Sequence, residues 1–232
     1  MHVANVAGIP IRLHWSFLVA AALVGLAGGW TAGPYGVIVM LGVVAALFTS
    51  VALHELGHAM TARHYGIRTH HITLYPFGGI AAIERMPSDP TQELAIALAG
   101  PAVNFALAAI LGQAWSMSGA TLVGTFALLN LGMGLFNLIP AFPMDGGRVL
   151  RALLVGRIGW YRATDTAIRV GRGFALLFLV VGVVKVIPSL VFVAIFLHVA
   201  LLAERRHLTQ MAFSRRSQAT WPGGWREGAQ PG

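Results

Sequence analysis

Cysteine is absent from this chain of 232 residues, and charged residues are scarce. Without cysteine there is no disulfide framework and no thiolate metal site, so any metal ligand must come from His, Asp or Glu. Only 10% of the residues are charged, whereas 56% are hydrophobic. This balance leaves too little polar surface for a water-soluble domain, and it indicates that the lipid bilayer is the solvent.

Long blocks of the chain contain almost no Asp, Glu, Lys or Arg. Two blocks carry none of these residues, and a third carries only Lys185. Because a transmembrane helix needs about 20 apolar residues, and because Gly, Pro and Ser interrupt each block, we expect two spans in each. The blocks are Leu13–Leu53, Leu94–Met144 and Gly173–Ala203. The predicted fold is therefore an all-α polytopic membrane protein with six transmembrane helices, near residues 14–29, 36–61, 92–116, 120–139, 168–186 and 189–204.

The basic residues predict the orientation of these spans, because positively charged loops stay in the cytoplasm. With six spans and both termini inside, all Arg residues fall on the cytoplasmic side and only Lys185 falls outside. A single tilted helix in the third block would instead move Arg205 and Arg206 to the outer face. We therefore expect a multi-pass protein of the inner (plasma) membrane with both termini in the cytoplasm.

The net charge of +8 could suggest a nucleic-acid partner, but inside-loop arginine explains it, and no basic motif with interleaved aromatic residues accompanies it. We expect no nucleic-acid binding. Residues 1–207 are predicted to form the membrane core. Residues 208–232 are polar and rich in Gly, Pro and Arg, which is typical of a flexible cytoplasmic tail.

Residues 69–85 differ from the segments around them. His71 to Tyr75 alternate polar and apolar side chains, Gly78 and Gly79 offer a turn, and Ile80 resumes the apolar pattern. The pattern predicts a short cytoplasmic β-hairpin between the second and third spans, and an irregular loop is the alternative.

The motif His54-Glu55-Leu56-Gly57-His58 closes the second predicted span. Positions i and i+4 of a helix share a face, so both imidazoles can reach one metal ion while Glu55 lies beside it. A zinc ion there lowers the pKa of water to about 7, and an adjacent carboxylate can take the proton as water attacks a carbonyl carbon. Because a carboxylate within a span costs about 2.5–3.5 kcal/mol on insertion scales, we interpret Glu55 as the catalytic base.

A catalytic zinc site normally has three protein ligands. Asp145 is the next ionisable group expected at membrane depth, in a segment where Pro140, Pro143, Gly146 and Gly147 disfavour a regular helix. In the six-span topology this segment and the His54–His58 motif both lie at the inner ends of their spans. Asp145 is therefore the candidate third ligand, and a helix-capping role for it is the alternative.

These two motifs resemble those of the site-2 protease family of intramembrane metalloproteases. The resemblance rests on His54-Glu55-Leu56-Gly57-His58 and on the segment from Asn137 to Arg148, and it covers nearly the whole predicted membrane core. It implies one Zn²⁺ per chain held by His54, His58 and Asp145, with Glu55 as general base. It also implies that the substrate is a single-span membrane protein cleaved in or near its transmembrane segment.

Further residues are candidates for substrate binding. The resemblance implies that Asn137 holds the substrate backbone, and Asn104 lies in a second family element, Gly100-Pro101-Ala102-Val103-Asn104. For Asn104 an interhelical hydrogen bond is an equal alternative. An exposed edge of the predicted hairpin, at Gly78, Gly79 and Ile80, could pair with an unwound substrate segment by β-strand addition.

Two other functions remain open at this stage. A divalent-metal transporter also places His and carboxylate residues in the membrane, but it usually needs successive polar sites, and the first, fifth and sixth predicted spans offer few. An inactive membrane scaffold is the second alternative, although all four central residues are present. His14 and His198 are expected in interfacial or packing roles, and a homo-oligomer is compatible with the sequence.

Overall fold

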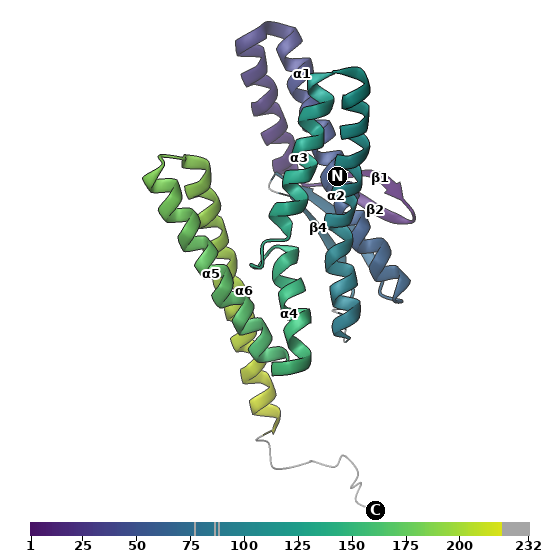
Figure 1. The fold of residues 1–232 in the computed structure, drawn as a ribbon. Coiled ribbons are helices and arrows are strands. Elements are labelled where there is room, and N and C mark those ends of the chain that lie inside the picture. Colours follow the sequence, from purple (N-terminus) through teal and green to yellow (C-terminus); the bar gives the residue numbers. More distant parts are fainter. Residues whose placement is uncertain (77, 86, 88, 220–232) are drawn as a thin grey trace, which may run out of the picture.

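The computed structural model describes residues 1–219 except 77, 86 and 88, and it is mostly helical with one small sheet (Figure 1). The predicted all-α class is therefore incomplete, since four strands are present. The strands are β1 (His2–Val6), β2 (Ile9–Leu13), β3 (Thr69–Tyr75) and β4 (Gly78–Ile83). The helices are α1 (Trp15–His64), α2 (Pro90–Ser118), α3 (Thr121–Asn137), α4 (Asp145–Ile158), α5 (Trp160–Val184) and α6 (Pro188–Ala219).

Helix α1 is a hairpin of two helical arms (Figure 1). The helical conformation breaks at Ala32 and Gly33, and Gly33 has a φ of 60°, which glycine adopts at little cost. Pro34 follows and cannot continue the hydrogen-bond ladder of the first arm. The arms pack closely where Gly28 meets Gly36, since a Cβ at either glycine would collide with the backbone of the other. Three glycines and one proline thus return the chain on itself.

Four described helices are long and apolar enough to cross a membrane, with α1 counted once; the others are α2, α5 and α6 as far as Gln210. Helix α3 is apolar but has only 17 residues. Each of the six predicted ranges coincides with helical segments, two in α1 and one each in α2, α3, α5 and α6, although the ranges 14–29, 120–139 and 168–186 extend one or two residues beyond the helix ends. Large apolar side chains such as Leu26 and Trp30 point outwards and are 70% and 92% exposed. These helices make the chain a multi-pass membrane protein.

The four strands form one sheet in the order β1-β2-β3-β4. Strands β3 and β4 pair antiparallel, so the hairpin interpretation of residues 69–85 holds. The predicted turn is wrong, however, because Gly78 pairs with Tyr75 and Gly79 with Leu74, which places both glycines inside β4. Strands β2 and β3 are parallel neighbours, although the whole of α1 lies between them in the sequence. Strand β4 lies at one edge of the sheet.

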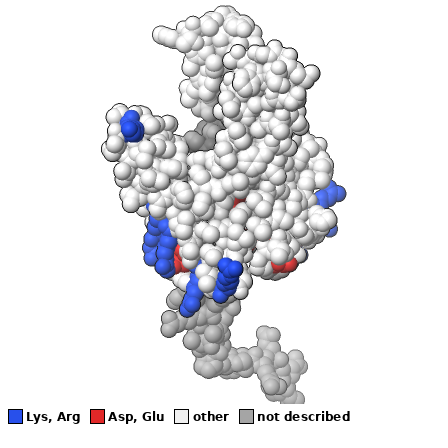
Figure 2. All heavy atoms as spheres, viewed as in Figure 1, with Lys and Arg blue, Asp and Glu red and all other residues white. Residues whose placement is uncertain are grey.

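Helix α2 contacts α1, α3 and α4, and helix α5 contacts α4 and α6. Helix α5 begins at Trp160, eight residues before the predicted boundary at residue 168. The charged residues that precede the apolar segment form the first turns of the same helix. Helix α6 continues to Ala219, so residues 208–219 of the predicted tail are helical, and residues 220–232 lie outside the described residues. The visible charged side chains gather mainly over the lower half of the molecule, and one basic side chain stands apart from them at the upper left (Figure 2).

Candidate metal centre

His54 and His58, one turn apart on α1, meet Asp145 at the first turn of α4. The Nε2 atoms of the two imidazoles are 3.1 Å apart, and each lies 3.2 Å from Oδ2 of Asp145. All three residues are buried. The 86 residues between His58 and Asp145 are thus folded so that three potential ligand atoms form a nearly equilateral triangle.

The hydrogen bonds of the imidazoles orient both rings towards this triangle. Nδ1 of His58 donates to the carbonyl oxygen of Ile96 at 2.6 Å, and Nδ1 of His54 donates to Oδ1 of Asn104 at 2.5 Å. Because a neutral imidazole carries one proton, these bonds leave the lone pair on each Nε2. Partners of this kind fix the tautomer and ring orientation of metal-binding histidines.

The geometry fits a metal ion. Three atoms that all carry lone pairs converge, and Oδ2 of Asp145 is buried without a hydrogen-bond partner in the described part of the chain. Such an arrangement is repulsive unless a cation lies between the atoms. In a tetrahedral zinc site with bonds of about 2.0–2.1 Å, ligand atoms lie about 3.3–3.4 Å apart, close to the separations observed. Among the described residues this is the only group of three or more His, Asp or Glu residues arranged for a metal ion.

A chain of buried amide and hydroxyl groups supports His54. Nδ2 of Asn104 donates to Oδ1 of Asn130 on α3 at 3.1 Å, and Nδ2 of Asn130 donates to Oγ of Ser50 on α1 at 3.2 Å. Asn104 and Asn130 are almost completely buried. This series of hydrogen bonds links α1, α2 and α3 around the metal centre. Within it, Asn104 positions the imidazole of His54.

Glu55 projects beside the triangle into a cavity of about 410 Å³ that Asp145 and His58 also line. Gly79 and Ile80 of β4 form the opposite wall. The backbone of Gly79 packs directly on the Glu55 side chain, where an added Cβ would lie 3.2 Å from Oε1. The cavity therefore brings a carboxylate, the metal centre and a strand edge to one place.

Gly100 on α2 leaves room for both imidazoles. A Cβ at this position would lie 2.7 Å from Cε1 of His54 and would also collide with His58. The sequence motif indicated close helix packing at this glycine, but it did not reveal that the neighbours are the candidate ligands. Sequence analysis missed Asn130, although an amide in the apolar segment 121–137 indicates a buried partner, and it missed the backbone carbonyl of Ile96, which carries no signal in the sequence.

The other predicted site residues lie apart from the triangle. Nδ2 of Asn137 donates to the carbonyl of Met133 in its own helix, and neither Asn137 nor Gly78 lines the cavity. Nδ1 of His14 accepts from the backbone N–H of Ser16 at the start of α1, while His198 is exposed on α6. Asp145 lies in the first turn of α4 rather than at its N-cap, which is Met144.

Comparisons with known proteins agree with this geometry. The sequence matches the family described as peptidase family M50 over residues 42–115 and 110–179. A zinc metalloprotease of Methanocaldococcus jannaschii is 38% identical over 208 residues, which cover 87% of this chain and 59% of that protein. Stage IV sporulation protein FB of Bacillus subtilis is 31% identical over 178 residues, which cover 72% of this chain and 60% of that protein. The chain thus spans about three fifths of the length of these curated relatives.

A solved structure supports the same relationship. The site-2 protease from Methanocaldococcus jannaschii matches with a TM-score of 0.66 at 35% identity, and the match covers 88% of this chain and 94% of that one. A membrane metalloprotease is the class that the apolar helices and the His-His-Asp centre define. More particularly, the chain belongs to peptidase family M50, the site-2 proteases, which confirms the resemblance inferred from the two motifs.

Proposed function

We propose that this protein is an intramembrane zinc endopeptidase that hydrolyses a peptide bond in or near the transmembrane segment of a single-span membrane protein, as a step of regulated proteolysis. The observation that carries the proposal is the convergence of His54, His58 and Asp145 beside Glu55 in one cavity, at the end of an apolar helix. Zinc is proposed because the donor set suits it and because the Methanocaldococcus jannaschii relative is named as a zinc enzyme.

We also propose six membrane spans with both termini in the cytoplasm of the cell. Strands β2 and β3 are parallel neighbours, so α1 must leave the sheet and return to it, which supports two crossings by its two arms. A straight helix of 50 residues would instead be about 75 Å long. The gathering of charged side chains over the lower half of the molecule supports a cytoplasmic location for that end (Figure 2).

The residues of the cavity supply the parts needed for hydrolysis. His54, His58 and Asp145 would hold one zinc ion, which when bound supplies Lewis-acid polarisation and a lower pKa for water. Glu55 accepts the proton of the attacking water and returns it to the leaving amine. The hydrogen bonds from Asn104 and Ile96 keep both imidazoles in place during this cycle.

A substrate helix must be unwound before its peptide bond can be attacked, and β4 offers a means. It is an edge strand, and its residues Gly79 and Ile80 line the cavity beside Glu55. Ile80 is 60% exposed, so an added strand could reach it. We propose that the substrate binds β4 by β-strand addition, with main-chain hydrogen bonds holding the unwound segment.

Proline within β4 tests this binding mode. Variants Ile80→Pro and Ala81→Pro are expected to differ, because only one of two successive backbone N–H groups points to the free edge. The variant that removes the outward N–H should lower cleavage at least about tenfold through a higher KM and should retain zinc. Equal and unchanged cleavage in both variants would exclude strand addition at β4.

The proposed activity is tested with purified protein in liposomes that contain a single-span model substrate. We expect cleavage within or near the membrane segment, complete inhibition by a zinc chelator, and recovery when zinc is restored to one ion per chain. Zinc flux assayed in the same liposomes tests the transporter alternative. Chelator-resistant cleavage would contradict the metalloprotease mechanism, and zinc flux without cleavage would favour transport.

A further inference from the structure

The catalytic cavity contains more positive charge than the proposed hydrolysis uses. Three carboxylates line it, those of Glu55, Asp145 and Glu204, together with three arginines: Arg85 beyond the end of β4, and Arg148 and Arg151 on α4. A guanidinium group in a cavity at the membrane surface is costly without an anionic partner. The partners of these three side chains therefore indicate which charges are already compensated.

Arg151 has a structural role, because its charge is compensated within the protein. It is 1% exposed, its Nε donates to Oε1 of Glu93 on α2 at 3.0 Å, and Nη1 lies 4.0 Å from Oε1 of Glu204 on α6. Its guanidinium group also lies 5.1 Å from the ring centre of Phe142. Two carboxylates and an aromatic ring thus satisfy Arg151, and it ties α2, α4 and α6 together.

Arg85 and Arg148 differ from Arg151. In the described part of the chain neither side chain makes a hydrogen bond or an ion pair. Arg148 is half-buried in the cavity wall, whereas Arg85 is exposed, so the cost of an unpartnered guanidinium group falls on Arg148. Glu84, the neighbour of Arg85, does not line the cavity. With a zinc ion compensating Asp145, and with Glu204 facing Arg151, Glu55 is the lining carboxylate left to oppose these two cations, so the cavity would attract an additional anion.

We propose that Arg85 and Arg148 form an anion subsite that binds an acidic side chain of the substrate close to the scissile bond. Arg148 follows Asp145 by three residues on α4, and such positions share one helix face about 5–6 Å apart. Arg85 lies just past Ile83, where a strand added to β4 would leave the sheet. At about 3.3 Å per residue, this places the acidic side chain roughly two to four residues from the bond cleaved.

The inference rests on the proposed proteolytic function and deepens it by naming a feature of the substrate. A peptide carboxylate is favoured over a lipid phosphate because Glu55 and Gly79, beside which the peptide must lie, line the same cavity. A subsite of this kind would also select where a long apolar segment is cut, since apolar side chains alone discriminate weakly.

The test is a series of single-span substrates in neutral-lipid liposomes, with Asp or Asn placed in turn at each of four positions on either side of the cleaved bond. For the wild-type protein we expect Asp to raise kcat/KM at least about tenfold over Asn at one or two adjacent positions. In Arg148→Gln the ratio of Asp to Asn should fall towards one. In Arg148→Glu, Lys at the same position should become the preferred residue.

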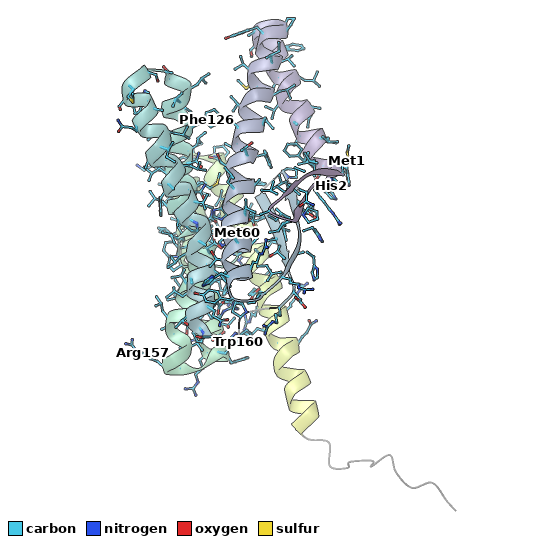
Figure 3. All side chains as sticks on the ribbon, turned by 90° about the vertical axis from the view of Figure 1, so that its right-hand side faces the viewer. Met1, His2, Met60, Phe126, Arg157 and Trp160 are labelled. Atoms are coloured by element: carbon cyan, nitrogen blue, oxygen red, sulfur yellow. The ribbon has the colours of Figure 1, made fainter. Side chains whose placement is uncertain are left out.

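Arg157→Gln is the matched control, because Arg157 is exposed in the last turn of α4 (Figure 3) and does not line the cavity. This variant should keep the wild-type preference for Asp. Equal cleavage of all Asp and Asn substrates by the wild-type protein would overturn the subsite while leaving the proposed protease function standing. An effect of Arg148→Gln that appears only in anionic-lipid liposomes, and is equal for Asp and Asn substrates, would assign Arg148 to lipid and would also overturn the subsite. No cleavage of any substrate would instead contradict the protease function itself.

Discussion

Glu55→Gln is expected to leave zinc bound while slowing cleavage by a factor of about 10²–10⁴, the usual contribution of a general base. The glutamine side chain has nearly the same shape as glutamate, so it should still fill the space against Gly79. It cannot accept a proton from the attacking water, however. Because the triangle of candidate ligands consists of His54, His58 and Asp145, zinc content should remain at the wild-type level.

The measurement combines metal analysis of the purified variant with the cleavage rate under single-turnover conditions. Glu84→Gln serves as the matched control, since Glu84 is exposed near the end of β4 and does not line the cavity. It should retain full activity. Loss of zinc from Glu55→Gln would make Glu55 a ligand, and wild-type cleavage by this variant would remove it from the mechanism.

Gly100→Ala should weaken zinc binding by a factor of about 5–150 and reduce cleavage at limiting zinc in parallel. The added methyl group occupies the space that both imidazoles need, with 2.5 Å to Cε1 of His58 and 2.7 Å to Cε1 of His54. Overpacking of a well-packed site costs about 1–3 kcal/mol. Here the strain falls on rings whose other nitrogens are already held by Asn104 and Ile96, so the rings cannot turn away freely.

Gly112→Ala on the same helix is the matched control, because a Cβ at Gly112 has no neighbour within 4 Å. Zinc affinity is measured by competition with a chelator of known affinity, and helix content is compared by circular dichroism. We expect the control to bind zinc as the wild-type protein does. Equal zinc affinity of Gly100→Ala and Gly112→Ala would show that a methyl group at position 100 does not displace the imidazoles, which would contradict the close approach of Gly100 to both rings.

The sequence was sufficient for features that depend on local spacing or on bulk composition. The i, i+4 spacing of His54 and His58 put both rings on one helix face, and charge-free blocks marked the apolar helices. Asp145 stood out because acidic residues are rare in such a chain. The structure brings these predicted ligands together at 3.1–3.2 Å.

Features that depend on non-local pairing could not be obtained in the same way. Strands β1 and β2 have five residues each, and the parallel partner of β2 follows only after the 50 residues of α1. Nothing within these short segments identifies a strand partner that lies beyond α1 in the sequence. The partner of Asn104 was open for the same reason, since a lone polar residue in an apolar helix shows that a partner exists without identifying it.

The buried chain from Ser50 through Asn130 and Asn104 to His54 has a consequence for the biogenesis of the protein. Ser50 and Asn130 each also bond a carbonyl of their own helix, but the bonds that join these groups to one another and to His54 form only once α1, α2 and α3 have been inserted and packed together. A chain released after α1 alone carries the two histidines without the groups that orient them. Orientation of the two candidate histidine ligands is thereby tied to completed helix assembly, so a partly inserted chain is expected to bind metal less well than the complete one.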